Sequence, residues 1–349
     1  MQVVGDIGGT NCRLAMYEND QILFQKTYST TEYPHLVDAI QLFIKESGKT
    51  PVSCCLAIAG PVIKHTDRQE VTLTNQNHKT IVDSLEYSKQ LNIPCRIIND
   101  FEAVGFYLSR ERTKAEFAVL QEGTSLNQQL VLYIGAGTGL GVGFLFKNNV
   151  FPSEGGHTRF PAENEFEKKF IQSVHEEIGY KHLSCDRVIS GLGIARLYNF
   201  VADMTVNDVL NGIDEVVEVF GGKITVENKT IKEILNVDVT KDIAYQVSSK
   251  ALEGNEVARL VMGIFFYWYG RTIADHIVTF LPKHVYVTGG IIVKNLKLVT
   301  QDELIKGIFH KAIERKGRMG VITKGVPISV ILSGDVGLLG CSAAINSLE

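Results

Sequence analysis

The sequence predicts an α/β protein of two domains. The chain has 349 residues, more than one ordinary core holds, and 45% of them are hydrophobic and available for burial. One mixed plan of strands and helices also occurs twice along the chain. A glycine-rich turn follows a strand in each half, at residues 8–9 and 135–143. Together these observations indicate two similar α/β domains.

The first half of the chain alternates between strands and helices. Apolar runs bounded by turn residues predict strands at 2–4, 12–17, 21–27, 53–59 and 97–98. Apolar residues at helical spacing predict helices at 34–46, 81–91 and 103–108. Gly48 ends the first helix, as a C-terminal glycine often does, and residues 73–78 are polar and loop-like. We expect the first domain to comprise residues 1–108.

The second half repeats this plan after a polar stretch at 109–116, which is the expected domain boundary. Strands are predicted at 117–120, 130–134, 140–146, 285–287 and 328–332. Helices are predicted at 163–178, 192–201, 256–280 and 336–346. Residues 204–250 read as a charged, mostly helical insertion whose role the sequence does not indicate. The second domain is expected to cover residues 109–333.

The charge and cysteine content of the chain indicate which kind of partner and which cellular compartment to expect. The chain carries 35 Lys and Arg against 39 Asp and Glu, a net charge of -4, which favours neither nucleic acid nor anionic lipid. We therefore expect a small-molecule partner. The six cysteines form no Cys-x-x-Cys pair and no zinc-spaced cluster, which favours a reducing cytoplasm. No signal peptide is evident, and the most apolar run, 260–270, is too short to span a membrane, so we expect a soluble cytoplasmic protein.

The first glycine turn has the features of a phosphate-binding loop. Asp6 precedes Gly8 and Gly9, and Thr10 and Asn11 follow them. Adjacent glycines let backbone N–H groups approach a phosphate closely, because no Cβ stands in the way, and the two polar residues add side-chain donors. A tight hairpin alone would explain the glycines but neither the acid nor the donors. Asp6 is then placed to hold Mg²⁺, directly or through water.

The second glycine-rich turn has glycine at every other position from 135 to 143. This spacing does not match the dinucleotide fingerprint, which needs a glycine where Leu140 stands. The Walker spacing fails too, because Phe43 occupies its first glycine position before Gly48-Lys49-Thr50. We interpret the turn as a second phosphate cradle with Thr138 as a donor. The alternative is a glycine-rich strand that lets another backbone approach.

Two further segments place acids at turns. The strand at 97–98 stops at Asn99-Asp100, where Asp100 either caps the following helix or acts on a ligand. The segment Ser153-Glu154-Gly155-Gly156-His157 holds an acid and an imidazole around a flexible turn. A lone histidine is usually structural, but an acid and a histidine separated only by glycines can converge on one polar ligand.

These segments together resemble the motifs of the bacterial-type glucokinase family, which belongs to the superfamily of sugar kinases, actin and Hsp70 chaperones. The motifs occur in the family's order as Gly5-Asp6-Ile7-Gly8-Gly9-Thr10-Asn11, Ile98-Asn99-Asp100-Phe101, Gly135-Ala136-Gly137-Thr138-Gly139-Leu140-Gly141, Glu154-Gly155-Gly156-His157 and Arg187-Val188-Ile189-Ser190-Gly191. The resemblance runs from Gly5 to about Ala344. It implies two ribonuclease-H-like domains, the actin-like ATPase or sugar kinase fold, with ATP and glucose in a central cleft. It also implies that residues 334–349 return to the first domain.

The resemblance assigns a role to each matching position. The residues implied to bind sugar hydroxyls are Asn99, Asp100, Glu154, His157 and Asp186. Those implied to bind the nucleotide are Gly5, Asp6, Gly8, Gly9, Thr10, Asn11, Gly137, Thr138, Gly289 and Gly290. Asp186 stands where the family has a glutamate, so its contact with the sugar either needs an inward loop or passes through water. His78, after Thr74-Asn75, replaces an aromatic residue of the family.

The implied reaction is ATP-dependent phosphorylation of glucose at its 6-hydroxyl, the first step of glycolysis, with Asp100 accepting the hydroxyl proton. The changes at Asp186 and His78 leave open a kinase for another hexose, such as mannose or N-acetylglucosamine. A non-enzymatic ATP-binding scaffold like actin is the alternative from another class, although Glu154 and His157 would have no use there. The resemblance also implies a homodimer.

Overall fold

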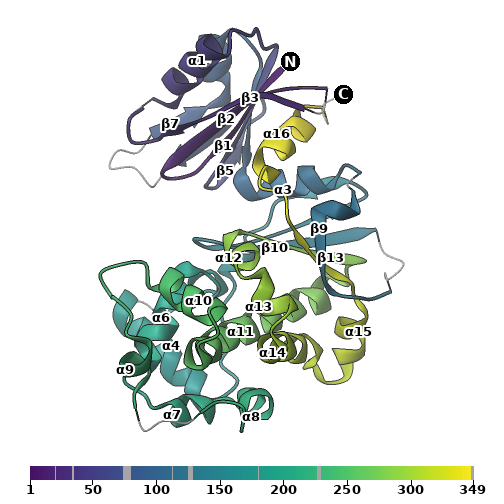
Figure 1. Cartoon of the computed structure of the whole chain (residues 1–349). Helices are drawn as coiled ribbons and strands as arrows, with labels where there is room; N and C mark the ends of the chain where they lie inside the picture. Colours follow the sequence, from purple (N-terminus) through teal and green to yellow (C-terminus); the bar gives the residue numbers. More distant parts are fainter. Residues whose placement is uncertain are drawn as a thin grey trace. The chain divides into compact units, whose positions relative to one another are not determined.

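The computed structural model describes residues 1–19, 21–33, 35–73, 80–111, 113–124, 129–179, 181–225 and 229–346. The chain divides into two compact units (Figure 1). Unit 1 comprises Met1–Lys114, Gly143–Pro152 and Ser333–Glu349, and unit 2 comprises Ala115–Val142 and Ser153–Leu332. Unit 1 thus includes the segment 143–152, which the sequence had placed in the second domain.

Unit 1 is built on a five-stranded sheet of order β3-β2-β1-β4-β8. Its strands are β1 (Gln2–Ile7), β2 (Asn11–Glu18), β3 (Gln21–Ser29), β4 (Ser53–Ile58) and β8 (Cys95–Asn99). The first three form an antiparallel meander, and β4 and β8 run parallel to β1. In the parallel register Ile7 pairs with Ile58, and Ile58 pairs with Asn99. The turn after β1 and the residue pair Asn99-Asp100 therefore emerge at the same edge of the sheet.

Helices cover both faces of this sheet. Helix α1 (Leu36–Ser47) buries one apolar side against Val3, Ile7 and Leu56. It ends at Gly48, whose left-handed φ of 62° suits glycine. On the other face, α3 (Asp100–Leu108) and α16 (Val336–Asn346) pack together on Val4, Ala57 and Ile98 (Figure 1).

A small antiparallel sheet in unit 1 was not predicted. It consists of β5 (Val62–Lys64), β6 (Gln69–Leu73) and β7 (Thr80–Asp83). The predicted helix at 81–91 is wrong over its first three residues, because α2 spans only Ser84–Leu91. Ile81 is exposed and Val82 fully buried, the alternation of a strand. Asp83 then caps α2, its carboxylate accepting the N–H groups of Leu85 and Glu86 at 2.9 and 3.0 Å.

The segment 143–152 joins unit 1 through its apolar side chains. Strand β11 (Leu140–Phe146), within which the division of the chain falls, pairs with the short β12 (Asn149–Phe151). Val150 packs against the cluster that contains Tyr17 and Phe106. The alternation of apolar residues could not reveal this packing. Such a pattern predicts which side chains of a strand are buried, but not whether they are buried in the core of unit 1 or of unit 2.

The second large sheet has the order β12-β11-β10-β13-β14-β9. Its remaining strands are β9 (Phe117–Gln121), β10 (Leu130–Ala136), β13 (His284–Thr288) and β14 (Ile328–Ile331). Strands β10, β13 and β14 are parallel, and β9 is antiparallel to β14. The longer helices of unit 2 are α4 (Glu165–Ile178), α6 (Gly191–Val201), α10 (Ile243–Leu252), α11 (Glu256–Phe280) and α14 (Glu303–Glu314). The shorter helices are α5 (Cys185–Val188), α7 (Val206–Leu210), α8 (Asp214–Phe220), α9 (Ile231–Leu235), α12 (Gly290–Lys294), α13 (Leu296–Thr300) and α15 (Gly320–Gly325), and single 3-10 turns lie at η1 (Lys114–Glu116), η2 (Gly155–His157) and η3 (Gly317–Met319).

Helix α11 forms the centre of unit 2 and has the bounds predicted for it. It is apolar around most of its circumference, which is typical of a helix enclosed on all sides. Within the described ranges, no helix combines the length and apolarity that crossing a membrane requires.

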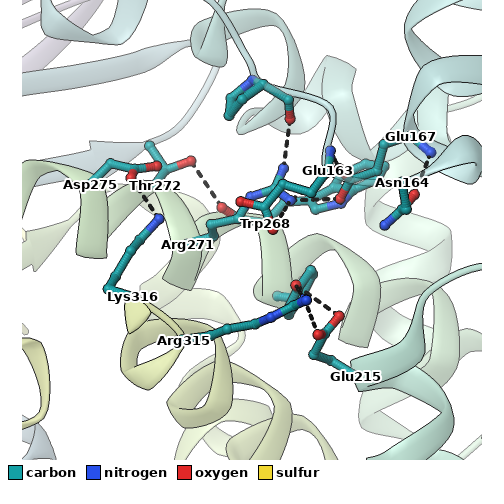
Figure 2. A network of polar contacts seen from close by, with 12 residues as sticks. Glu163, Asn164, Glu167, Glu215, Trp268, Arg271, Thr272, Asp275, Arg315 and Lys316 are labelled. Carbon is teal, nitrogen blue, oxygen red and sulfur yellow. Dashed lines mark hydrogen bonds and ion pairs between the residues drawn. The ribbon is translucent and has the colours of Figure 1, made fainter. Parts of the chain in front are cut away.

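A buried polar network joins α11 to the first turn of α4 and to the segment that precedes it (Figure 2). Arg271 contacts both carboxylate oxygens of Glu167, at 2.8 and 3.0 Å, and the indole N–H of Trp268 donates to the same carboxylate at 2.8 Å. Glu167 is 0% and Arg271 3% exposed. Arg271 also donates to the carbonyl of Pro161 at 2.9 Å. This network fixes the backbone that follows the turn of Glu154 and His157.

Candidate active site

The glycine turn after β1 is held from behind by Thr30. The N–H of Thr30 donates to the carbonyl of Thr10 at 3.0 Å, and its hydroxyl donates to the carbonyl of Gly9 at 2.8 Å. Gly8 closes the hairpin by donating to the carbonyl of Asn11 at 2.9 Å. Thr10 and Asn11 are exposed. The carbonyls of Gly9, Thr10 and Asn11 thus accept hydrogen bonds, while the side chains of Thr10 and Asn11 face solvent, as a phosphate-binding loop requires.

Asp6 is paired with a cation that the sequence analysis did not single out. It lies opposite Arg13 in the β1–β2 pair, and the guanidinium Nη2 is 3.0 Å from Asp6 Oδ2. Arg13 also contacts Asp335 Oδ1 at 3.0 Å and the carbonyl of Gly334 at 2.9 Å. A Cβ on Gly337 would lie 2.7 Å from the Asp6 carboxyl carbon. The start of α16 therefore closes around Asp6. The sequence feature that could have pointed to this ion pair is the presence of one arginine, Arg13, in the otherwise apolar run 12–17.

Two residues near this loop have structural roles. Gly5 is buried, and a Cβ there would lie 2.7 Å from Leu56 and 2.9 Å from Leu14, so glycine at this position permits close packing of the sheet. Burial, with a smaller contribution from Asp6, raises the pKa of the Cys12 thiol to about 12. The thiol therefore stays protonated at neutral pH and is a poor nucleophile.

Asn99, not Asp100, caps helix α3. The Asn99 side chain accepts the N–H groups of Phe101 and Glu102, while Glu102 accepts the N–H of Asn99, which completes a capping box. The Asn99 amide also donates to the carbonyl of Gly60 at 2.8 Å. The interpretation of Asp100 as only a cap is therefore wrong, since its neighbour has that role. A hydrogen bond from the Asn99 side chain also acts on the Asp100 carboxylate and favours its charged form, so the two expected sugar-binding residues contact each other.

Asp100 occupies the first helical position and its side chain remains accessible. One carboxylate oxygen accepts the N–H of Phe101 at 2.9 Å. The residue is exposed at the surface, yet the groups around its carboxyl remove much of its hydration. This desolvation, helped by the negative charge of Asp6, raises the pKa of Asp100 above its ordinary value, and the bond from Phe101 opposes the shift. A raised pKa makes the carboxylate a stronger proton acceptor.

Unit 2 brings the other three expected sugar ligands around one residue, Leu140. A Cβ on Gly156 would lie 1.8 Å from the carbonyl oxygen of Leu140, so only glycine lets this turn approach so closely. The N–H of Leu140 donates to Asp186 Oδ1 at 2.7 Å. Glu154 and His157 are exposed, with Glu154 Oε2 and His157 Nε2 3.7 Å apart. Backbone bonds from Cys185 to Thr158 and from Phe160 to Leu183 tie the two segments together.

A cavity of about 690 Å³ in unit 2 is bordered by the second glycine turn. Gly137, Thr138 and Gly290 line one side of it, as the phosphate and adenosine assignments require. Gly289 has a φ of 95°, and a Cβ there would lie 2.3 Å from the carbonyl of Ala136. The volume lies within the range of sites for nucleotide-sized ligands.

The rest of this cavity comes from residues that the sequence analysis did not assign to any site. Its remaining wall includes Leu192 and Ala195 of α6, and Lys241, Ile243 and Tyr245 in and before α10. The insertion at 204–250 thus supplies a wall of the cavity. Ser248 of α10 donates to Asn295, next to α12, at 2.6 Å and so joins two of the lining segments. His78, with Thr74 and Asn75, lies outside the described residues.

Comparison with known proteins identifies the family. The glucokinase family model matches residues 3–348. A glucokinase of Nostoc punctiforme is 32% identical over 353 residues, covering 97% of each chain. The chain belongs to the glucokinase family. This membership confirms the resemblance drawn from the five motifs.

Solved structures of glucokinases share the fold of this family member. A glucokinase from an Antarctic psychrotroph superposes with a TM-score of 0.72 at 25% identity, covering 99% of this chain and 98% of that one. A Balamuthia mandrillaris glucokinase, solved with glucose, gives a TM-score of 0.72 at 19% identity, covering 99% and 93%. The predicted two-domain, actin-like ATPase fold of the sugar kinases is confirmed.

Proposed function

We propose that this glucokinase-family protein transfers the γ-phosphoryl group of ATP to the 6-hydroxyl of glucose, giving glucose 6-phosphate and ADP. The observation that carries the proposal is the accessible Asp100 carboxylate of raised pKa, at the same sheet edge as the exposed turn of Thr10 and Asn11. Family membership over nearly the whole chain supports it.

Asp100 accepts the proton of the sugar hydroxyl. An ordinary aspartate, with a pKa of about 3.9, is far too weak a base to remove that proton before attack. It aligns the hydroxyl and takes the proton late, as the oxygen bonds to the γ-phosphorus and the bond from that phosphorus to the β,γ-bridging oxygen breaks. Such general-base assistance contributes roughly 10²–10⁴-fold in rate.

We assign the binding of the sugar hydroxyls to the five polar residues that the family resemblance implies: Asn99, Asp100, Glu154, His157 and Asp186. The exposure of Glu154 and His157, at 73% and 60%, supports this role, because neither side chain is committed to the core. Asp186 has one oxygen engaged with Leu140, which leaves the other for the sugar.

We assign nucleotide binding to the residues of the two glycine turns and of the start of α12 that the family resemblance implies: Gly8, Gly9, Thr10, Asn11, Gly137, Thr138, Gly289 and Gly290. The cavity bordered by Gly137, Thr138 and Gly290 supports this assignment. The adenosine part lies against the α10 wall, where Tyr245 is 66% exposed and offers an aromatic face.

Asp6 fits a magnesium ion carried by ATP. Mg²⁺ takes one or two protein carboxylates and completes its shell with phosphate oxygens and waters, so no dedicated protein cage is needed. Arg13 contacts one Asp6 oxygen and leaves the other for the ion or its water. The ion would neutralise charge on the phosphates during transfer. Family resemblance further supports a cytoplasmic location and a homodimer. Sedimentation of the purified protein tests the oligomeric state.

The experiment that tests the function is ADP release from Mg·ATP by the purified protein with glucose, mannose, fructose, N-acetylglucosamine or no sugar. Turnover confined to glucose is the expected result. Turnover only with another hexose would overturn the assigned substrate, and ADP release that no sugar stimulates would overturn the kinase assignment. The Asp100→Asn variant, assayed beside the parent protein, excludes a contaminating kinase.

A further inference from the structure

A second cavity of unit 2, of about 280 Å³, has three basic side chains at its walls. We call it the basic pocket and define it by Arg159, Lys168 and His175, with Phe160, Ile171 and Leu183 as its apolar floor. Among the described residues that line it, none is acidic. The mechanism above uses none of these side chains. A small cavity with cationic walls and an apolar floor suits a compact anion that carries a short carbon chain.

The basic groups are available to a ligand. His175 Nε2 is buried without a hydrogen-bond partner among the described residues, a state that native proteins seldom leave uncompensated. Within the same part of the chain, no hydrogen bond or ion pair engages the Arg159 guanidinium, which is exposed. Lys168 contacts Glu165 at 2.5 Å, but both side chains are more than half exposed, so this pair is weak and can exchange for a ligand.

The floor of the basic pocket is rigid. Arg271 holds the Pro161 carbonyl, and its guanidinium lies 5.1 Å from the centre of the Phe160 ring (Figure 2 shows the Arg271 network). The Arg271–Glu167 pair behind it is fully buried. The Phe160 and Pro161 part of the floor is therefore held in place by Arg271. Such preorganisation reduces the ordering that a ligand must impose.

The basic pocket is connected to the sugar-binding residues through two backbone hydrogen bonds. The N–H of Phe160 donates to Leu183 at 2.9 Å, and the N–H of Cys185 donates to Thr158 at 2.8 Å. Arg159 lies between these bonds, two residues after His157, and Asp186 directly follows Cys185. Arg159 and Ser184 form an isolated antiparallel bridge, so a ligand that pulls on Arg159 acts on the two backbone segments that lead to His157 and Asp186.

We propose that the basic pocket binds a small phosphate monoester and that binding there alters the affinity for glucose. Arg159 and His175 hold the phosphate, since a guanidinium and an imidazole supply directed N–H donors. The carbon chain of the ligand lies on Phe160, Ile171 and Leu183. The effect on glucose rests on the proposed function, whereas binding of the phosphate monoester does not.

The test is calorimetric titration of glycerol 3-phosphate into the full chain, with and without saturating glucose and a non-hydrolysable ATP analogue that fills the phosphate subsites of the nucleotide. Binding is expected in both conditions. It should weaken at least about tenfold in Arg159→Gln and in His175→Gln, as expected for losing a charge-assisted hydrogen bond. Lys169→Gln, an equal loss of charge one residue along α4 from Lys168, should bind normally. Thermal unfolding verifies that each variant is folded.

Two results would overturn the binding site: absence of heat from the parent protein at millimolar glycerol 3-phosphate, or unchanged affinity in both variants. The coupling is measured as the change in KM for glucose at fixed ATP, which should appear in the parent protein and vanish in Arg159→Gln. Binding without such a change would overturn the coupling alone. Failure of the kinase assignment would abolish turnover but leave the titration intact.

Discussion

The carboxylate of Asp186 accepts the backbone N–H of Leu140 at 2.7 Å, and this bond joins the expected sugar site to the glycine turn. A Cβ on Gly139 would lie 2.2 Å from the same oxygen. The glycine therefore allows Asp186 to reach the turn. One carboxylate oxygen of Asp186 thus supports the loop of Gly137 and Thr138, and the other oxygen remains for the proposed contact with the sugar.

Replacing Asp186 separates these two roles. Asp186→Ala leaves the Leu140 N–H without its partner, a loss of about 1–3 kcal/mol, and we expect KM for both glucose and ATP to rise. Asp186→Asn keeps an oxygen acceptor for Leu140, so KM for ATP should stay near that of the parent while KM for glucose rises. Steady-state kinetics with each substrate varied in turn measures both. Equal effects of the two variants on KM for ATP would contradict a role in supporting the turn.

Adding a single methyl group at Gly156 should strongly reduce activity. The Cβ of Gly156→Ala would lie 1.8 Å from the Leu140 carbonyl, so the turn of Glu154 and His157 must move away. We expect glucose turnover to fall at least about a hundredfold, because displacing a positioning group by about 1 Å can have that effect. Gly325→Ala is the matched control, since a Cβ there meets nothing within 4 Å. Comparable losses in both variants would point to general instability instead.

Asp100→Asn should separate catalysis from binding. The amide retains the hydrogen bond from Phe101 but cannot take up a proton, so kcat should fall by roughly 10²–10⁴-fold with little change in KM for glucose. Rates of ADP release over a range of glucose concentrations give both constants. A kcat within a few-fold of the parent value would remove Asp100 from the catalytic role.

The same variant should be more stable at neutral pH. Because the folded-state pKa of Asp100 is raised, the folded protein holds the proton more tightly than the unfolded chain does. The resulting stabilisation is present below the ordinary pKa of aspartate and is lost as pH rises through the raised value, so the charged carboxylate is unfavourable at pH 7. Thermal unfolding should give a higher Tm for Asp100→Asn at pH 7 and a smaller difference at acidic pH. A lower Tm at pH 7 would contradict this sign.

The pair of Glu167 and Arg271 should dominate the stability of unit 2. Glu167→Gln removes the fully buried counter-charge of Arg271 and leaves the guanidinium only the more exposed carboxylate of Glu163, at 3.3 Å. Breaking a buried pair destabilises by about 3–5 kcal/mol, and we expect a loss near the lower end of that range. Denaturant unfolding measures the change. The control is Glu165→Gln, which removes only an exposed contact with Lys168 and should have little effect. Similar midpoints for the two variants would refute the importance of the buried network.

Local sequence patterns predicted the long elements well. Helix α11 was predicted over its observed range because residues 256–280 are largely apolar over a long stretch; the structure adds that Asn255 caps the helix. Strand β7 was missed, since four residues of alternating exposure are too short to separate from the helix that follows. The sequence analysis considered only Asp100 as the cap of α3, although Asn99 is an equally favourable cap residue, and the bonds from Phe101 and Glu102 show that Asn99 has this role.

The site was less predictable than the fold. Repeated glycines and acids at turns can be recognised in a sequence from residue type and spacing. The motifs around Gly137 and Glu154 were found in this way. The cavity wall that contains Tyr245 could not be recognised in this way. An aromatic residue at helical spacing gives the same sequence pattern whether it lines a cavity or packs in a core. Asp335, the second partner of Arg13, is 322 positions away along the chain, and no local pattern can reveal such a pair.

The position of α16 sets an order of events during synthesis. Leu338, Cys341 and Ala344 complete the apolar cluster over Val4 and Ile98, yet the ribosome makes them only after every residue of unit 2. The nascent unit 1 sheet therefore has this face covered by α3 alone while unit 2 emerges and folds. The apolar surface left for α16 is a natural target for chaperones, and a chain released before α16 is made exposes that surface permanently.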